Sequence, residues 1–384
     1  MMKVFTLLAL WCTTLLSAPL YNILDIDSTI IMHNETEQMQ GNSTADEPLP
    51  KERNSYSSLY AQLRVDYDVT EDIFLSVGGK ANGVLLENTY TTPQYVRGKM
   101  TSDTLNRALL SEASINYDNG TLALVAGRQS VDYDWLLGSI DGILAMAGSD
   151  EDMSLRLFWF QDYNVLQYNY YVRIKNINEN KGMYGAIAKV NYSPFDLSFF
   201  SYYVEDLRHI FGGHFNLMYD YFGINISYSE ARALSLASYN YDESFFNTSL
   251  EFLYRRHYIE VGFSQTGKNG LLAMIQMGSF MFGQFYLSNQ VDRENATNGF
   301  VKYIYANRQW RVECIGGITQ YDNNFVHAEE GLRSYEVDLY LKYKINAALS
   351  ADMGVMFMDV DEKDPLQVDQ NLVMLNLVYS YEKY

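Results

Sequence analysis

Apolar and polar residues alternate along most of the chain, from about residue 56 almost to the end. In the clearest stretch, apolar side chains occupy every second position from Tyr335 to Ile345, and residues such as Glu336 and Lys342 stand between them. A period of two predicts β-strands with one apolar and one polar face. The same pattern recurs over residues 59–67, 184–192, 222–228 and 347–357.

The length and the ends of these segments indicate strands that cross a membrane. The segments run for about 9–13 residues, whereas strands of soluble proteins average about 5–6 and a tilted membrane-crossing strand needs about 9–11. Aromatic residues such as Tyr184, Tyr192, Phe222 and Tyr335 gather at the ends of the apolar faces, as in the girdles of outer-membrane barrels. The pattern therefore predicts an all-β protein, a transmembrane antiparallel β-barrel with a wet interior and an apolar outside.

Turn sequences separate the segments in pairs. Asp118-Asn119-Gly120 is typical of a tight hairpin turn, and short turns alternate with longer connections. This asymmetry is characteristic of outer-membrane barrels, whose strand number is usually even. We expect about 18 strands, within a range of about 16–19. They would form one domain over residues 55–384, because a closed barrel cannot leave strand edges unpaired in lipid. Residues 131–178 fit either strands or a loop folded into the barrel.

The N-terminus predicts export. Residues 1–18 combine one lysine with an apolar run and the small residues Ser17 and Ala18, which is the pattern of a secretory signal peptide. Residues 19–54 are polar and acidic, and we expect a mobile periplasmic leader there. Together with the barrel pattern, these features predict the outer membrane of a Gram-negative bacterium. Removal of the signal peptide leaves Cys314 as the single cysteine, so no disulfide is expected within the mature chain.

Composition supports this interpretation and excludes other classes of protein. The chain of 384 residues has a formal net charge of −19, is 48% hydrophobic and contains 33 tyrosines and 20 phenylalanines. It is too apolar for a disordered chain and too acidic for a general nucleic-acid binder. A mean hydropathy of −0.20 suits a barrel with one apolar and one polar face better than a bundle of membrane helices.

Two segments resemble known outer-membrane proteins. The stretch from Asn371 to Tyr381 resembles the last strand of bacterial outer-membrane proteins, which the barrel-assembly machinery reads. Residues 126–129, Ala-Gly-Arg-Gln, followed by Asp and Gly at 141–142, are similar to the Opr-type porins of epsilon-class proteobacteria, distant relatives of the substrate-specific porins of pseudomonads. This resemblance implies a channel of about 18 strands that is often trimeric, lies in outer-membrane lipid and passes small hydrophilic solutes.

Porins select solutes at a constriction, usually where a loop folds inward, because charged groups on opposite walls set up a transverse field. The resemblance places Arg128 there, although alternation with Leu122 and Leu124 turns it outward unless a bulge follows Gly127. The adjoining loop would supply Asp132, Asp134 and Asp141. Inward positions of other strands supply further pore-lining candidates: Arg64, Arg156, Lys189, Arg311, Glu313, Glu336, Asp338 and Lys342. The alternative for each is a charge that merely hydrates the barrel wall.

We expect an outer-membrane porin that lets ions and small hydrophilic solutes diffuse passively through a water-filled pore. Two alternatives remain open: an outer-membrane enzyme, such as a protease or phospholipase, and a non-conducting structural or adhesion barrel. The chain lacks the Gly-x-Ser-x-Gly and His-Glu-x-x-His motifs of common hydrolases. We therefore expect no enzyme activity, no cofactor, no metal site and no nucleic-acid partner, and the resemblance adds a homotrimer.

Overall fold

The computed structural model describes residues 24–41, 52–89, 107–133, 135–166, 171–174, 177–178, 181–234, 242–271, 290–323, 329–361, 364 and 368–383. All regular structure in these ranges is β-strand, and they contain no helix long and apolar enough to cross a membrane. The strands are β1 (Leu24–Gly41), β2 (Glu52–Asp68), β3 (Ile73–Thr89), β4 (Arg107–Asp118), β5 (Leu122–Tyr133), β6 (Leu136–Gly148), β7 (Met153–Leu166), β8 (Tyr171–Ile174), β9 (Met183–Tyr192), β10 (Phe195–Val204), β11 (Arg208–Tyr219), β12 (Phe222–Ala233), β13 (Glu243–Tyr254), β14 (His257–Thr266), β15 (Glu294–Ala306), β16 (Trp310–Asn323), β17 (Glu329–Lys344), β18 (Leu349–Val360) and β19 (Val368–Lys383). The predicted signal peptide, residues 1–18, lies outside the described residues.

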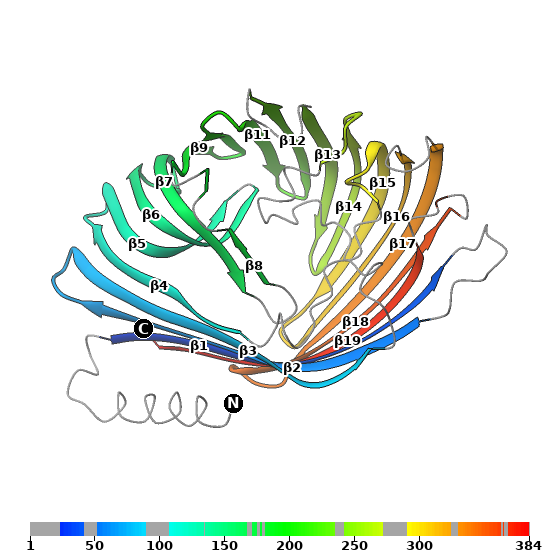
Figure 1. The fold of residues 1–384 in the computed structure, drawn as a ribbon, viewed down its shortest axis with the longest axis horizontal. Helices are drawn as coiled ribbons and strands as arrows, with labels where there is room; N and C mark the ends of the chain where they lie inside the picture. Colours follow the sequence, from blue (N-terminus) through cyan, green and yellow to red (C-terminus); the bar gives the residue numbers. More distant parts are fainter. Residues whose placement is uncertain are drawn as a thin grey trace.

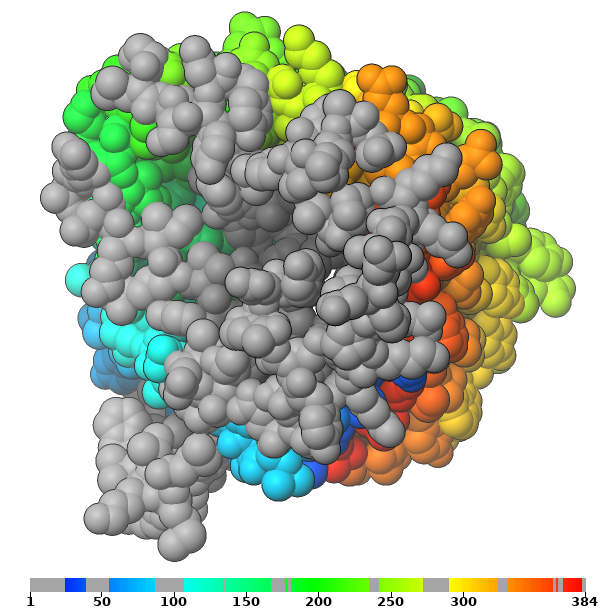
Figure 2. All heavy atoms as spheres, turned by 45° about the vertical axis from the view of Figure 1, so that its right-hand side comes forward, coloured from blue at the N-terminus to red at the C-terminus, as the bar shows by residue number. Residues whose placement is uncertain are grey.

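Eighteen of these strands form the wall of a closed barrel (Figure 1). Each pairs antiparallel with the next, and β1 closes the ring by pairing with β19, so that Ile26 lies opposite Lys383. The exception is β8, which is four residues long and pairs with the far end of β7, while the first part of β7 pairs in the wall with β9. The predicted antiparallel barrel of 18 strands is therefore confirmed. In Figure 2, β15 to β19 lie side by side along this wall, coloured from yellow to red.

The two faces of the wall differ as the alternation predicts. On β17 the outward side chains of Tyr335 and Val337 are 46% and 48% exposed, whereas those of the inward Glu336 and Asp338 are 1% and 0% exposed. Large apolar side chains stand at outward positions on many other strands too, which gives the outside of the barrel the character that lipid requires.

Strand β1 contradicts the leader predicted for residues 19–54. Residues 24–41 are a wall strand that pairs with β2 on one side and with β19 on the other, and β2 itself begins at Glu52, before the predicted start of the barrel. The outward face of β1 carries the polar Ser28 and Asn34 among its apolar residues. Because this mixed pattern interrupts the alternation, the strand was not predicted. Without β1, the edges of β2 and β19 would have no partner in the membrane.

Short turns join the strands at one end of the barrel. In the predicted turn at 118–120, the Gly120 amide donates to the Asp118 carboxylate at 2.8 Å, and Gly120 adopts a φ of +80°, which favours glycine. Connections at the other end are longer, except those between β5 and β6 and between β10 and β11, so the predicted asymmetry is confirmed. The short turns span residues 69–72, 119–121, 149–152, 193–194, 220–221, 255–256, 307–309 and 345–348.

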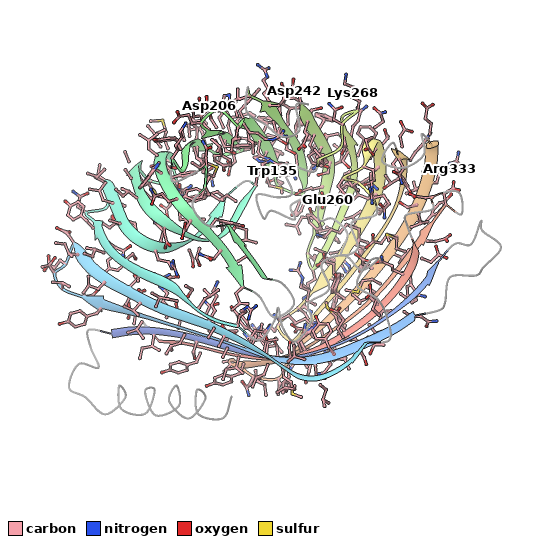
Figure 3. The ribbon with its side chains drawn as sticks, in the orientation of Figure 1. Trp135, Asp206, Asp242, Glu260, Lys268 and Arg333 are labelled. Atoms are coloured by element: carbon pink, nitrogen blue, oxygen red, sulfur yellow. The ribbon has the colours of Figure 1, made fainter. Side chains whose placement is uncertain are left out.

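Part of the sheet leaves the wall and turns into the barrel. The pairing of β4 with β5 ends at Ala113 and Arg128, and the pairing of β7 with β9 ends at Phe160 and Met183. Beyond these points β5, β6 and β7 still pair with one another, and β7 pairs with β8. We call this part the inner sheet: residues 129–133, 136–140, 163–166 and 171–174. Its hairpins reach into the ring (Figure 1), and Trp135, at the tip of the β5–β6 hairpin, lies inside the ring (Figure 3).

Apolar side chains hold the inner sheet against one side of the lumen. Leu136 and Ile140 are fully buried, and the Trp135 ring packs edge-on against Phe245 of β13, with 6.2 Å between the ring centroids. The same cluster contains buried wall residues, among them Phe160, Met183, Phe200, Tyr202 and Ile210. The interior is thus apolar on this side, which is an exception to the predicted wet interior. The described residues of the inner sheet within 131–178 are strands, whereas residues 142–148 and 153–160 belong to the wall, and this decides between the two predicted alternatives.

Candidate functional site: the pore lining

Charged side chains of β13 to β16 form a row on the inner wall. Lys302 of β15 lies opposite Glu260 of β14, which in turn lies opposite Glu251 of β13. On the other side of the row, the Lys302 ammonium and the Arg311 guanidinium both contact the Glu313 carboxylate, at 3.0 and 2.9 Å. Three carboxylates thus share two cations, and the predicted candidates Arg311 and Glu313 lie together in this row.

A second charged group lies on the inner faces of β2 and β4. The Arg64 Nε atom is 3.0 Å from a carboxylate oxygen of Asp66 and 3.1 Å from one of Glu112. The Glu112 side chain is almost completely buried. Because these residues alternate with the apolar outward Leu63 and Val65, the strand register turns them towards the lumen. The predicted candidate Arg64 is therefore held by two acidic partners.

Three other predicted candidates also face the lumen. Arg156 of β7 pairs with the Asp150 carboxylate and lies over the ring of Tyr133 in the inner sheet, 5.4 Å from its centroid. Lys189 of β9 is 3.5 Å from the carboxylate of Asp196 on β10. Lys342 of β17 lies in register between Arg311 of β16 and Asp352 of β18. These three basic groups thus stand beside carboxylates.

The predicted candidates Glu336 and Asp338 face inward from β17 but are buried. Asp364, in the connection between β18 and β19, is also buried, and it accepts hydrogen bonds from the Tyr321 hydroxyl at 2.9 Å and the Asn323 amide at 2.8 Å. These carboxylates lie beneath the accessible surface of the lumen. These carboxylates therefore contribute mainly to the packing of side chains in this part of the interior.

Arg128 and Asp141 lie opposite each other on β5 and β6 and form a bidentate ion pair, in which Nε and Nη2 donate to the two carboxylate oxygens. The described pairings of β5 have no register shift at Gly127, so Arg128 keeps the outward face that simple alternation predicts. The bulge lies on β7 instead. Asp132 is exposed on the inner sheet, and Asp134 lies outside the described residues.

Sequence reasoning missed the lumen groups of β1, because it assigned that segment to a leader. The His33 ring is fully buried and meets the Asn376 amide oxygen of β19 at 2.6 Å and the Tyr56 hydroxyl of β2 at 3.1 Å. It therefore bridges both neighbours of the closing strand. Apolar residues at positions 26, 30 and 32, with Asp27 and His33 on the opposite face, were the pattern that could have revealed this strand.

Solved structures with this fold are known. Pseudomonas aeruginosa OccK9 (OpdG) is 9% identical, with a TM-score of 0.74 over 95% of this chain and 100% of that chain. Acinetobacter baumannii OccAB1 is 11% identical, with a TM-score of 0.72 over 94% and 97%. The Pseudomonas aeruginosa outer membrane protein OpdK is 13% identical, with a TM-score of 0.68 over 94% and 99%. The sequence matches no protein-family model and no curated protein. At these identities the likeness shows the fold, and it agrees with the predicted resemblance to pseudomonad porins.

Proposed function

We propose that this protein is a porin of the Gram-negative outer membrane, through which ions and small hydrophilic solutes diffuse passively. The observation that carries the proposal is a closed ring with an apolar outside, a charged inner wall over β2, β4 and β13 to β17, and an inner sheet that narrows the lumen. A water-filled path with charged walls passes hydrated solutes and disfavours apolar ones. The fold shared with OpdK, described as an outer membrane protein, supports this location.

Selectivity in this proposal comes from the charged groups that line the lumen. Ion-paired cations and carboxylates along the wall produce a local field that acts on a solute at close range. The lining residues we propose are Arg64, Arg156, Lys189, Arg311, Glu313 and Lys342, with Asp132 on the inner sheet. Export by a signal peptide over residues 1–18, insertion by the barrel-assembly machinery and assembly as a homotrimer belong to the same proposal, supported by the resemblance of the sequence to Opr-type porins.

Reconstitution into planar lipid bilayers tests this function. Purified, folded protein should produce stable, ohmic steps in current, and liposomes that contain it should swell in solutions of small sugars. Protein that stays folded, as judged by its heat-dependent mobility on gels, but gives neither steps nor swelling would contradict the proposal and favour a non-conducting barrel. Protein unfolded by boiling before reconstitution is the control for contaminating channels.

A further inference from the structure

Among the described residues, the backbone pairing of the inner sheet joins that of the wall at one level. After Arg128, β5 no longer pairs with β4. After Phe160, β7 no longer pairs with β9. The bend at this level has two local causes. Gly127 takes a φ of +118° and lies so close to β4 that a Cβ atom would be 2.3 Å from the Ala113 carbonyl oxygen, and β7 has one extra residue, Gln161, opposite the pair 141–142. The angle of the inner sheet is therefore held by side-chain contacts at this level, in addition to the apolar packing at its tip.

One guanidinium group connects the strands that separate there. Arg128 Nε donates to Asp141 Oδ1 of β6 at 2.5 Å, and Nη2 donates to Oδ2. Its third donor, Nη1, reaches the backbone carbonyl of Leu110 on β4 at 3.1 Å. Leu110 lies beyond Ala113, in the part of β4 that no longer pairs with β5. Arg128 thus donates a hydrogen bond to a carbonyl of β4 that lies beyond the pairing with β5. The same guanidinium fixes the base of the β5–β6 hairpin through Asp141.

The environment of this pair makes it stronger than an ordinary surface ion pair. The side chains of Arg128 and Asp141 are 21% and 30% exposed. A planar guanidinium that meets both oxygens of a carboxylate fixes direction as well as distance, and charge-assisted bonds of this kind are roughly twice as strong as neutral ones. Lysine, with one compact ammonium, cannot bind the two oxygens and the Leu110 carbonyl in the same fork geometry.

We propose that Arg128 is a positioning residue: with Asp141 it clamps the root of the inner sheet to β4 and so sets the width of the pore. The inference rests on the proposed porin function, because the inner sheet is what narrows the lumen. The clamp acts on pore width through the angle of the sheet, whereas a pore-lining arginine would act on ion preference through its charge. The two roles predict different measurements.

Two variants that remove opposite charges separate these roles. Arg128→Gln and Asp141→Asn both break the clamp, so both should raise the unit conductance and make the current steps less uniform. The charge-swapped double variant, Arg128→Asp with Asp141→Arg, keeps the ion pair between β5 and β6 but removes the donor to the Leu110 carbonyl, so it should restore uniform steps only in part, as should Arg128→Lys. Arg311→Gln is the matched control, because it removes a lumen arginine that is paired with a carboxylate but lies on β16, away from the strands that bend.

A second readout does not depend on conduction. Trp135 is buried against Phe245 at the tip of the inner sheet, so with the other three tryptophans, Trp11, Trp159 and Trp310, replaced by phenylalanine, its fluorescence reports the position of the sheet. Both clamp variants should shift its emission to longer wavelength and increase quenching by acrylamide, while Arg311→Gln should not.

Two results overturn the clamp. One is Trp135 emission that stays unchanged in both variants. The other is a pair of opposite shifts in reversal potential, with the unit conductance unchanged, which would make Arg128 an ion-selecting charge instead. A wild-type barrel that conducts nothing would refute the porin function, but the Trp135 measurement would still decide whether the clamp exists. Should Arg128→Gln fail to fold, Asp141→Asn and Arg128→Lys carry the same test.

Discussion

Ala188 offers a strict test of which face of the wall meets lipid. It lies in the middle of β9, four residues from Tyr184 and four from Tyr192, both exposed aromatics. Its neighbours in register, Phe199 of β10 and Leu155 of β7, are outward and exposed as well. At about 3.3 Å per residue, each aromatic girdle is ~13 Å away along the strand, or ~9 Å in depth for a tilt near ~45°. Ala188 therefore sits close to the midplane of the apolar band.

The substitution Ala188→Lys should destabilise the folded barrel strongly. A lysine on the lipid face at the midplane costs about 2–4 kcal/mol, and each ~1.4 kcal/mol is a factor of ten, so the equilibrium constant for folding should fall about 30- to 700-fold. The adjacent residue, Lys189, already carries a charge on the inward face, where it lies 3.5 Å from the Asp196 carboxylate. The same charge one position along the chain is thus accommodated, because alternation turns it to the lumen.

Reversible unfolding in denaturant from lipid bilayers, followed by tryptophan fluorescence, measures this free energy. Ala188→Leu is the matched control, because it adds a similar length of side chain without charge, and it should unfold at or above the wild-type denaturant concentration. Equal free energies of unfolding for the lysine and leucine variants would refute the assignment of this face to lipid. A loss of stability in both would instead indicate a steric cause.

Three further predictions follow from the lining and the bend. Gly127→Ala should prevent correct pairing of β4 with β5, because its Cβ atom would be 2.3 Å from the Ala113 carbonyl oxygen and its φ is +118°. Gly79→Ala should fold, because its Cβ atom would be 3.7 Å from the nearest atom, and heat-dependent mobility on gels distinguishes the two variants. Glu313→Gln should shift the reversal potential under a salt gradient towards anions, because Lys302 and Arg311 lose the carboxylate they share; an unchanged potential would remove this row from the selective path. Tyr321→Phe should lower the free energy of unfolding by about 1.5–3 kcal/mol, because the Asp364 carboxylate loses a buried donor, and the outward Tyr335→Phe should change it by less than about 0.5 kcal/mol.

Alternation predicted most of the wall because each strand repeats the same local rule. The segment from Tyr335 to Ile345 is apolar at every outward position, and the strand count, the antiparallel order and the short turns all follow from such stretches. Strand β1 escaped because polar residues such as Ser28 and Asn34 interrupt its outward face. Its place in the ring is set by backbone pairing with β2 and β19, and these backbone hydrogen bonds cannot be seen in the pattern of side chains along the sequence.

The pore could be predicted less well than the wall. Sequence period gives the face on which a residue lies, and this placed Arg64 and Glu313 correctly on the inner wall. It does not give the point at which a strand leaves its neighbour. Residues 131–178 therefore stayed open between strands and an inward loop, and the apolar lining beneath the inner sheet was not predicted. The resemblance placed Arg128 at the constriction only on the condition of a bulge after Gly127, whereas the extra residue is Gln161 on β7. The inward turn and the position of the extra residue both depend on which strands pair in the folded barrel.

The pairing of Ile26 with Lys383 has a consequence for the order of the chain. It brings the first and last described strands together at the end of the barrel that carries the short turns. The gap between β1 and β19 thus has a position equivalent to that of a short turn. The pairing of the strands does not distinguish any one of them as the first. A circularly permuted chain, joined there by a short linker and opened at the 307–309 turn between β15 and β16, would contain the same strand neighbours in the same register. What defines this barrel is the cyclic order of its strands, and the place where the chain is cut is incidental to it.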